Sequence, residues 1–492
     1  MTALKRSVGM PFVVSTSVEK PDPEVRKLIR SHVMLGKNQG KTRCSRRREA
    51  SNVADKSSPD EDLGAPSASF IMASHSVIPP KIGSDLSTIR FADAVEPSKV
   101  EFVLRFSSIA KQTLFPLDSC ILFEKREEAW MEPLAFDPAF LNAMIFTTLD
   151  YFDSMRHRNR YTMSQQTLPH YLRTLRLLRE RLLHENDQAL TTPTVSAILA
   201  LAAHAHFVGD SESAKHHLGG LRKIVSLRGG VATFSDNAKL LVEILRCDIG
   251  ISFHSGSRPL FFNKSSSQEP FLPYPDQTLL FKSMLKTTVR KTQYDSEIFL
   301  RDIDDELASA WRVMAGFCLM INLAAESKNR IATETFLDTM ASVIYRLLDM
   351  THFEAGSTEE AIRLGLLAFS SSIFLQWKQL GMSYDHLATT YRECLAELRV
   401  ESIPSRLLLW LLMVGAVSVF GCADDKWLKP WLRVNIDLGE VESWSDMQDI
   451  LKPLMWIGLV LDEPGKDVFD SSFVYDLVTP PLDHSPMSIG SL

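Results

Sequence analysis

Apolar residues recur at intervals of three and four residues along most of the chain from about residue 101 onward. This spacing is typical of amphipathic helices, whereas a strand alternates apolar and polar side chains at every second residue. The pattern predicts some ten helices and few strands, and therefore an all-α fold, either an irregular multi-helix bundle or stacked helix pairs. The expected helices cover approximately 137–158, 168–182, 194–208, 211–227, 237–247, 304–325, 331–350, 358–380, 384–400, 404–420 and 443–461.

The expected helix 168–182 is rich in leucine and arginine. The leucines form one stripe and the arginines occupy other positions around the helix, so the pattern predicts a leucine face toward the core and a solvated basic face. The stripe consists of Leu168, Leu172, Leu175, Leu178 and Leu182, and the basic positions are Arg173, Arg176, Arg179 and Arg181.

The most apolar stretch of the chain runs from Leu407 to Phe420. It is shorter than the roughly 20 residues that a helix needs to span a bilayer. The first residues after Met1 also lack the long apolar run of a secretory signal. We therefore expect a buried core helix at 407–420 and no membrane partner.

The composition divides the chain into four regions. Residues 1–48 form a basic arm with a short amphipathic helix near 23–35, and residues 49–100 form a linker rich in Ser and Pro. A helical body is expected over 101–462, followed by an acidic tail over 463–492. Segments with few bulky apolar side chains cannot offset the entropy of ordering, so we expect the arm, the linker and the tail to be disordered.

Charge is distributed unevenly between the arm and the rest of the chain. Residues 1–50 hold 12 Lys and Arg against 4 Asp and Glu, whereas the remaining residues hold 42 against 56. The densest basic cluster predicts a nuclear-localisation element that also contacts DNA phosphates without sequence preference. A solvated charge run without a partner is the alternative. The cluster comprises Lys37, Lys41, Arg43, Arg46, Arg47 and Arg48.

The spacing of chemistry-bearing residues predicts no catalytic centre, no metal site and no cofactor. The six cysteines are too far apart for a disulfide scaffold or a structural zinc site, which favours a reducing, intracellular location. Neither a dinucleotide-binding fingerprint nor a P-loop is present. His204 and His206 lie two residues apart on a helix and therefore face different directions, so we expect packed histidines rather than a chelating pair.

Two further arrangements remain as alternatives to simple packing. His216 and His217 would have to turn toward His204 and His206 from another helix to form a four-histidine site. Cys247 lies between Arg246 and Asp248, and a basic neighbour can activate a thiol. Because Cys247 shares a helical face with Ile244 and Ile251, we interpret it as a small core residue instead.

The segment His217–Val231 and the segment that follows it carry a family resemblance. A leucine-rich helix that ends in two glycines, followed by an Arg-Cys-Asp-Ile block and a Gly-Ser-Arg-Pro block, resembles the fungal-specific transcription factor domain. That domain is an all-helical regulatory region, and it follows a six-cysteine binuclear zinc cluster in many ascomycete regulators. The residues that carry the resemblance are His217, Gly220, Leu221, Arg228, Gly229, Gly230, Arg246, Asp248 and Pro259.

The arm departs from the family pattern because it contains Cys44 alone, so the six thiolates of a zinc cluster are missing. The residues Arg30 to Met34 resemble a short N-terminal box found in the subset of the family without the cluster. The resemblance therefore implies a nuclear transcription regulator or coregulator that is not an enzyme. Its expected partners are other transcription proteins or a small effector, with a homodimer as a further option.

A different class of protein also fits the sequence. A helical scaffold that binds a small molecule, or an enzyme unrelated to transcription, would show the same apolar periodicity. The basic cluster within residues 37–48 separates this hypothesis from that of a transcription regulator. Nuclear import or DNA contact requires the cluster, whereas small-molecule binding or catalysis does not.

Overall fold

The computed structural model describes residues 90–123, 131–156, 163–183, 187–262, 273–276, 299–399 and 403–474. Helical residues make up 76% of this part of the chain, in 15 α-helices and a few short turns of other helix types, and strands are almost absent from it. The predicted all-α class is confirmed. The basic arm, most of the expected linker and residues 475–492 lie outside the described residues. The disorder expected for them therefore stays a prediction.

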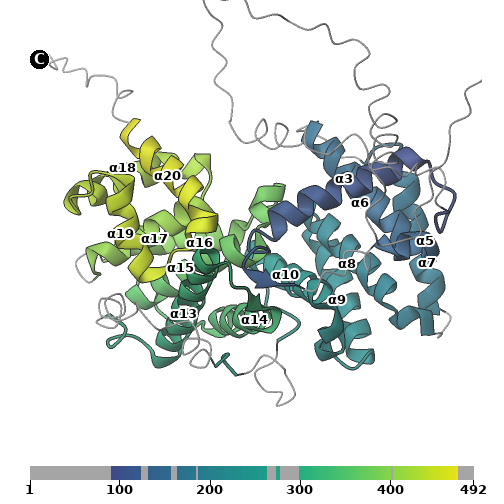
Figure 1. The fold of residues 1–492 in the computed structure, drawn as a ribbon, viewed down its shortest axis with the longest axis horizontal. Coiled ribbons are helices and arrows are strands. Elements are labelled where there is room, and N and C mark those ends of the chain that lie inside the picture. The colour runs from purple at the N-terminus through teal and green to yellow at the C-terminus, as the bar shows by residue number, and fades with distance from the viewer. Residues whose placement is uncertain are drawn as a thin grey trace, which may run out of the picture. The chain divides into compact units, whose positions relative to one another are not determined.

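The first half of the fold is a group of helices assembled around α6 and α8. Helix α6 packs against α3, α7 and α8, and α8 packs closely against α9 (Figure 1). The helices are α3 (Pro97–Leu114), α5 (Pro133–Phe136), α6 (Pro138–Arg156), α7 (Leu168–Leu183), α8 (Thr192–Phe207), α9 (Ser211–Leu227) and α10 (Ala238–Ser255), with the 3₁₀ helices η3 (Asp187–Leu190) and η4 (Val231–Asn237).

The second half contains the remaining helices, and α17 is its most apolar member. They are α13 (Asp305–Ser327), α14 (Thr333–Asp349), α15 (Thr358–Ser370), α16 (Asp385–Glu397), α17 (Ser405–Ser418), α18 (Asp425–Leu438), α19 (Trp444–Met455) and α20 (Gly458–Val474). Short helical turns are the π-helical η5 (Ser371–Leu375) and the 3₁₀ helices η6 (Trp377–Leu380) and η8 (Cys422–Asp424).

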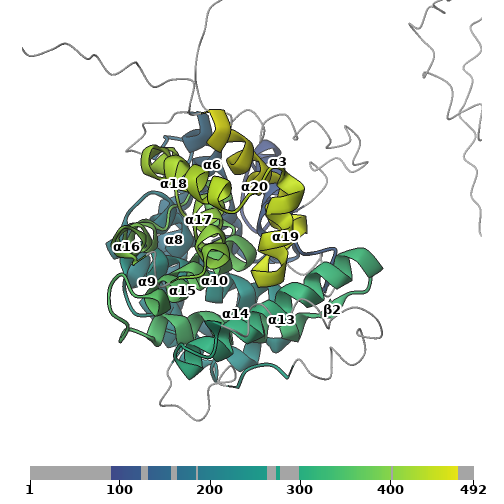
Figure 2. The ribbon, with the colours of Figure 1, turned by 90° about the vertical axis from the view of Figure 1, so that its left-hand side faces the viewer.

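Helix α10 joins the two halves. It contacts α8 and α9 on one side and α14 and α16 on the other, and Figure 2 shows it between α9 and α14. A two-residue strand from each half adds a second connection, because β1 (Ile121–Leu122) pairs in parallel with β2 (Ile331–Ala332). The two halves therefore share one hydrophobic core.

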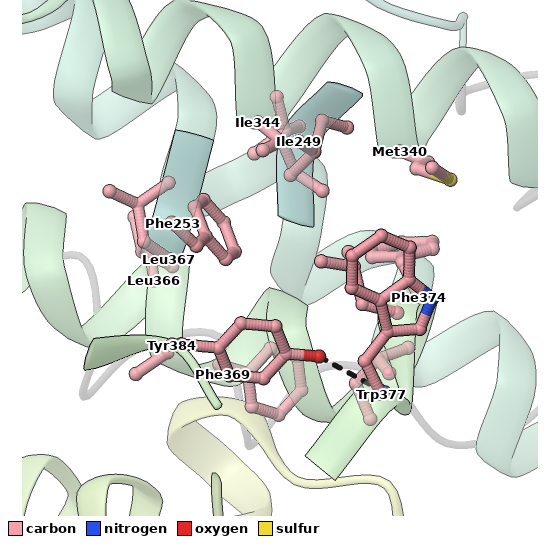
Figure 3. Packing of buried hydrophobic residues seen from close by; sticks show 14 of the residues in the cluster. Ile249, Phe253, Met340, Ile344, Leu366, Leu367, Phe369, Phe374, Trp377 and Tyr384 are labelled. Atoms are coloured by element: carbon pink, nitrogen blue, oxygen red, sulfur yellow. Dashed lines mark hydrogen bonds between the residues drawn. The ribbon is translucent and has the colours of Figure 1, made fainter. Parts of the chain in front are cut away.

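That shared core is dense in aromatic and branched side chains. In Figure 3, Ile249 and Phe253 of α10 lie beside Ile344 of α14, and Phe369 and Phe374 extend the cluster toward η6. The backbone N–H of Trp377 donates to the Tyr384 hydroxyl at 3.0 Å, which satisfies a polar group inside the core. Burial of this kind is the main favourable contribution to folding.

The expectation of a buried core helix at 407–420 is confirmed. Residues Leu407 to Gly415 of α17 are all buried. A longer helix, α13, is the one described helix that is long and apolar enough to cross a membrane. Its apolar side chains, among them Trp311 and Phe317, pack inside the core, which accounts for its composition.

Two expected region boundaries are wrong. The linker was expected to reach residue 100, but α3 begins at Pro97, and Val100 and Val103 are buried in a satellite cluster. The tail was expected from residue 463, but α20 continues to Val474 with Phe469 buried. Pro464 and Gly465 lie inside this helix, and Gly465 is required there, because a Cβ atom would lie 2.7 Å from the rings of Trp444 and Trp456.

The expected helix 443–461 is two helices, because side chains satisfy the backbone groups at its break near Trp456. The Trp410 indole donates to the Met455 carbonyl at 2.7 Å, and the Asn322 amide donates to the Trp456 carbonyl at 2.8 Å. These bonds replace the intrahelical ones that a continuous helix would make. Three other helices differ from the expectation. The α-helix expected over 358–380 is α15, which ends at Ser370, and α10 extends to Ser255 instead of ending near residue 247. Helix α18 was not predicted.

The orientation of α7 also differs from the expectation. Its buried side chains are His170, Thr174 and Leu178, whereas Leu168, Leu172 and Leu182 are exposed. The expected leucine face therefore points largely outward. The polar face is held inward by its partners on neighbouring segments, which are described below.

Candidate functional site

The C-terminal end of α9 contains three of the residues that carry the family resemblance. Gly229 and Gly230 have φ values of 109° and 95°, which only glycine adopts without strain. The N–H of Gly230 reaches back to the Val225 carbonyl at 2.8 Å and ends the helix. Arg228 donates to Thr192 at 3.0 Å and lies 4.3 Å from the Phe234 ring centroid, so this turn ties α9 to α8 and η4.

The other residues of that block lie along α9 itself. Leu221 is fully buried, and Gly220 has open space at its Cβ position. His217 is half-buried, and burial lowers the pKa of its imidazole, an effect that nearby Asp210 opposes. These three residues support the packing of α9 and do not converge on a shared polar centre.

Arg246 is a buried guanidinium at the junction of three segments. It donates to the Phe374 carbonyl at 2.6 Å and to the Leu114 carbonyl, and it pairs with Glu243 at 2.5 Å. Its guanidinium carbon lies 4.4 Å from the centroid of the Phe115 ring. Arginine suits this position because its planar fork satisfies several acceptors at once.

Asp248 forms a clamp on the loop that follows α10. Its carboxylate accepts the backbone N–H groups of Leu260 at 2.7 Å and Phe261 at 3.0 Å, and the Tyr345 hydroxyl donates to it at 2.9 Å. Burial raises the pKa of Asp248 to about 6, although these hydrogen bonds act in the opposite direction. Pro259 is half-buried immediately before the two clamped residues.

The motif residues therefore form two structural junctions, one at the end of α9 and one around α10. Arg246 and Asp248 lie on the same helix, and both connect segments far apart in the sequence. The spacing of the Arg-Cys-Asp-Ile and Gly-Ser-Arg-Pro blocks has a physical reason here, because the carboxylate of the first block orders the backbone of the second. The basic cluster, Lys37 to Arg48, lies outside the described residues.

Cys247 is a core residue. Its thiol is fully buried, and burial raises its pKa well above the ordinary value, so the thiolate that nucleophilic chemistry needs is disfavoured. His254, the histidine that follows on the same helix, faces His206 and Asp385.

The two histidines of α8 have separate environments, as their spacing predicted. His204 lies 2.9 Å from the Asp150 carboxylate. The ring of His206 packs against Trp377 and His254, and its Nε2 atom has no hydrogen-bond partner. Desolvation lowers the pKa of His206 to about 4. Within the described ranges, no three His, Cys, Asp or Glu side chains are placed to hold a metal ion together.

The inward face of α7 carries a polar network that the sequence pattern did not predict. His170 Nδ1 is 2.7 Å from the Asn142 amide oxygen, and its Nε2 is 3.1 Å from the Lys99 amine. Farther along the helix, Arg173 pairs with Asp93 and Arg181 pairs with the nearly buried Asp137. These bonds fix the rotation of α7 against α6.

The outward face of α7 is the surface feature that this rotation creates. It carries Leu168, Leu172, Leu182 and Leu183, with exposed fractions of 43%, 51%, 49% and 69%, and the exposed Arg176 and Arg179. A sequence signal existed, because His170 and Thr174 lie four residues apart on the other side of the helix. The partners of His170, which are Lys99 and Asn142, and the partner of Arg173, which is Asp93, are too distant in the sequence to be paired by inspection. We call these six residues the α7 outer face.

The fold and these junctions define an all-helical protein with one core shared by two groups of helices. Comparison with known proteins adds no family: no family model, no curated protein and no solved structure matches the chain.

Proposed function

We propose that this chain is a nuclear transcription regulator or coregulator, imported through its basic cluster and acting through contacts of its helical body with another protein. The observation that carries the proposal is the segregation of charge. Twelve of the 54 Lys and Arg residues lie in the first 50 positions, and the rest of the chain is net acidic. Short dense basic runs of this kind are read by import receptors and by nucleic-acid phosphates.

The resemblance to a helical regulatory domain gives a second line of support. The residues that carry it occupy defining positions in the fold, namely the glycine pair that ends α9 and the Asp248 clamp. A regulatory body without a DNA-reading module acts by binding other proteins. Any DNA contact is then electrostatic, belongs to the arm and weakens steeply with salt.

The test is the cellular distribution of the full chain with all six residues of the basic cluster replaced. Replacement of Lys37, Lys41, Arg43, Arg46, Arg47 and Arg48 by Gln should abolish nuclear enrichment. A matched control exchanges Lys for Arg and Arg for Lys at the same six positions, and it should stay nuclear. Unchanged distribution of the Gln variant would refute the import step and favour the alternative of a small-molecule-binding protein or enzyme.

A second test addresses regulation itself. The full chain fused to a DNA-binding domain of known site should change the output of a reporter that carries that site. The fusion with the Gly229→Val change, which is expected to disrupt the end of α9, should have a smaller effect. A reporter that does not respond to the intact fusion would contradict a regulatory role.

A further inference from the structure

The α7 outer face is an exposed stripe of leucines and arginines on a helix whose opposite side is held by hydrogen bonds and ion pairs. Leu168, Leu172, Arg176, Arg179 and Leu183 follow one another at intervals of four, four, three and four residues, which places them on one side of the helix. The stripe is about 22 Å long at the rise of an α-helix. Several exposed leucines on one side of a helix, flanked by polar residues, are a feature of protein-binding sites.

The rigidity of α7 distinguishes this stripe from a loosely attached helix. Helix α7 lies alongside α6 at the edge of the first group of helices (Figure 1). The His170 to Asn142 bond and the Arg181 to Asp137 ion pair fix its rotation at both ends. Turning the leucines inward would break these bonds and leave buried polar groups without partners, which is costly.

Two arginines give the stripe a charge. Arg176 and Arg179 are exposed, and within the described part of the chain neither has an ion-pair partner. Both lie among the leucines of the stripe, so an occupant of this face would place acidic groups near them. Arginine is also one of the residue types enriched in protein interfaces.

An exposed aromatic residue precedes the ion pair at the C-terminal end of α7. Phe136, the last residue of α5, is 60% exposed, and the next residue, Asp137, pairs with Arg181. The backbone at Phe136 therefore lies near the end of α7 that carries Leu182 and Leu183.

We propose that the α7 outer face binds an amphipathic helix of a partner protein, one that carries acidic residues beside its apolar stripe. This inference rests on the proposed function and names the chemistry of the partner. A helix fits because one side of α7 presents leucines near both of its ends and two arginines between them, all at helical intervals, and helices pack side by side through residues spaced in this way. The acidic residues would pair with Arg176 and Arg179.

Two other occupants fit the charges less well. In a symmetric dimer through this face, the same patch meets itself, so the arginines of one copy would approach those of the other without compensation. An anionic membrane would attract the two arginines, but the chain beyond residue 50 carries 42 basic against 56 acidic residues and would be repelled.

The experiment measures binding of a fluorescent probe peptide to the full chain by anisotropy. The probe is a designed helix of about 16 residues with leucines at intervals of three and four and glutamates flanking them. Its charge-reversed twin has lysine at every glutamate position. We expect the glutamate peptide to bind at least about tenfold more tightly than its twin, and more weakly as salt rises.

Variants of the chain locate the binding. Arg176→Glu with Arg179→Glu should weaken binding of the glutamate peptide by about tenfold or more and should strengthen binding of the lysine peptide. Leu172→Ser with Leu183→Ser should weaken both. The matched control places the same charge change at Lys223 and Lys426, which are exposed on α9 and α18, and should leave binding unchanged. All these sites are exposed, so circular dichroism should show unchanged helix content.

Several results would overturn the proposal. These are no binding of the glutamate peptide, equal binding of its twin, or binding that the α7 variants leave unchanged. Dimerisation of the wild-type chain that Leu172→Ser abolishes would assign the face to a second copy. Binding to vesicles of anionic lipid that the same variant abolishes would assign it to a membrane. The failure of nuclear import would contradict the proposed function while leaving the peptide result to stand on its own.

Discussion

Helices α9 and α7 are 17 and 16 residues long, and both carry leucines at helical spacing, yet they bury different kinds of side chain. Helix α9 buries Leu218 and Leu221 together with Ile224 and Val225. Helix α7 buries His170 and Thr174 and leaves most of its leucines exposed. The apolar pattern that correctly describes α9 therefore fails for α7.

The difference lies in the partners that each helix meets. The polar side of α9 faces solvent, so only its apolar stripe has anything to pack against. The polar side of α7 meets Asn142, Asp137 and Asp93, which pair with its histidine and with two of its arginines. A buried polar group with good partners costs little, whereas an unpartnered one is expensive, so these bonds decide which face turns inward.

The largest expected change in stability comes from replacing a buried leucine of α9, in comparison with an exposed leucine of α7. Leu221→Ala in α9 should lower the free energy of unfolding by about 2–5 kcal/mol, because it removes a fully buried side chain and leaves a cavity. Leu172→Ala in α7 should change it by less than about 0.5 kcal/mol, because half of that side chain is exposed. Urea unfolding of both variants measures this. Equal losses would show that α7 buries its leucines.

The second prediction concerns His206 of α8, a buried polar group that lacks the partners found in α7. Its pKa of about 4 lies below that of the unfolded chain, so the unfolded state binds more protons as the pH falls from 6.5 to 4. Stability is therefore lost over this window, by up to about 3 kcal/mol. Asp248 acts in the opposite direction. Its pKa is raised to about 6 in the folded protein, so its protonation stabilises the protein as the pH falls through much of the same window.

The His206→Phe variant isolates the histidine contribution. Asp248 is present in both chains, so its effect cancels in the comparison. The difference in unfolding free energy between wild type and variant, measured at pH 6.5 and at pH 4, should shift in favour of the variant at the lower pH. A difference that does not change with pH would mean that His206 finds a partner for its proton in the folded state.

A third prediction sharpens the account of how α9 ends. Gly229→Val should destabilise the protein by about 1–3 kcal/mol, because a β-branched residue is strained at positive φ. Gly219→Ala, inside the same helix with open space around its Cβ position, should stabilise it by about 0.5–1 kcal/mol. Melting temperatures of the two variants should therefore move in opposite directions. Movement in the same direction would contradict the left-handed turn at Gly229.

The smallest expected loss of stability comes from replacing His170 of α7. His170→Leu should cost about 1–2 kcal/mol, because the Asn142 oxygen and the Lys99 amine lose a partner inside the protein. Thermal unfolding measures the loss. A variant as stable as the wild type or more so would show that a leucine suits this face as well as the histidine does, and that the polar network does not set the rotation of α7.

How far the sequence predicts this structure depends on the range of the interactions involved. The positions of most helices, the burial of α17 and the glycine turn after α9 depend on local periodicity and backbone geometry, and they were predicted. The break at Trp456 and the rotation of α7 depend on Asn322, Trp410, Asn142 and Asp93, which approach only in the folded chain. The candidate functional site shows the same difference between local and long-range interactions. The motif residues were identified in advance, but their role as junctions and the α7 outer face were not.

The most direct test of the central claim is the solvent exposure of α7 leucines in the native chain. Single cysteines are introduced as Leu172→Cys or Leu178→Cys in a chain with Cys44→Ser and Cys422→Ser. Of the remaining cysteines, Cys120, Cys247, Cys318 and Cys394 are all buried. Under native conditions the thiol at position 172 should react with a maleimide dye within about tenfold of a free thiol, and that at position 178 at least about a hundredfold more slowly. Protection at 172 with rapid labelling at 178 would contradict the account.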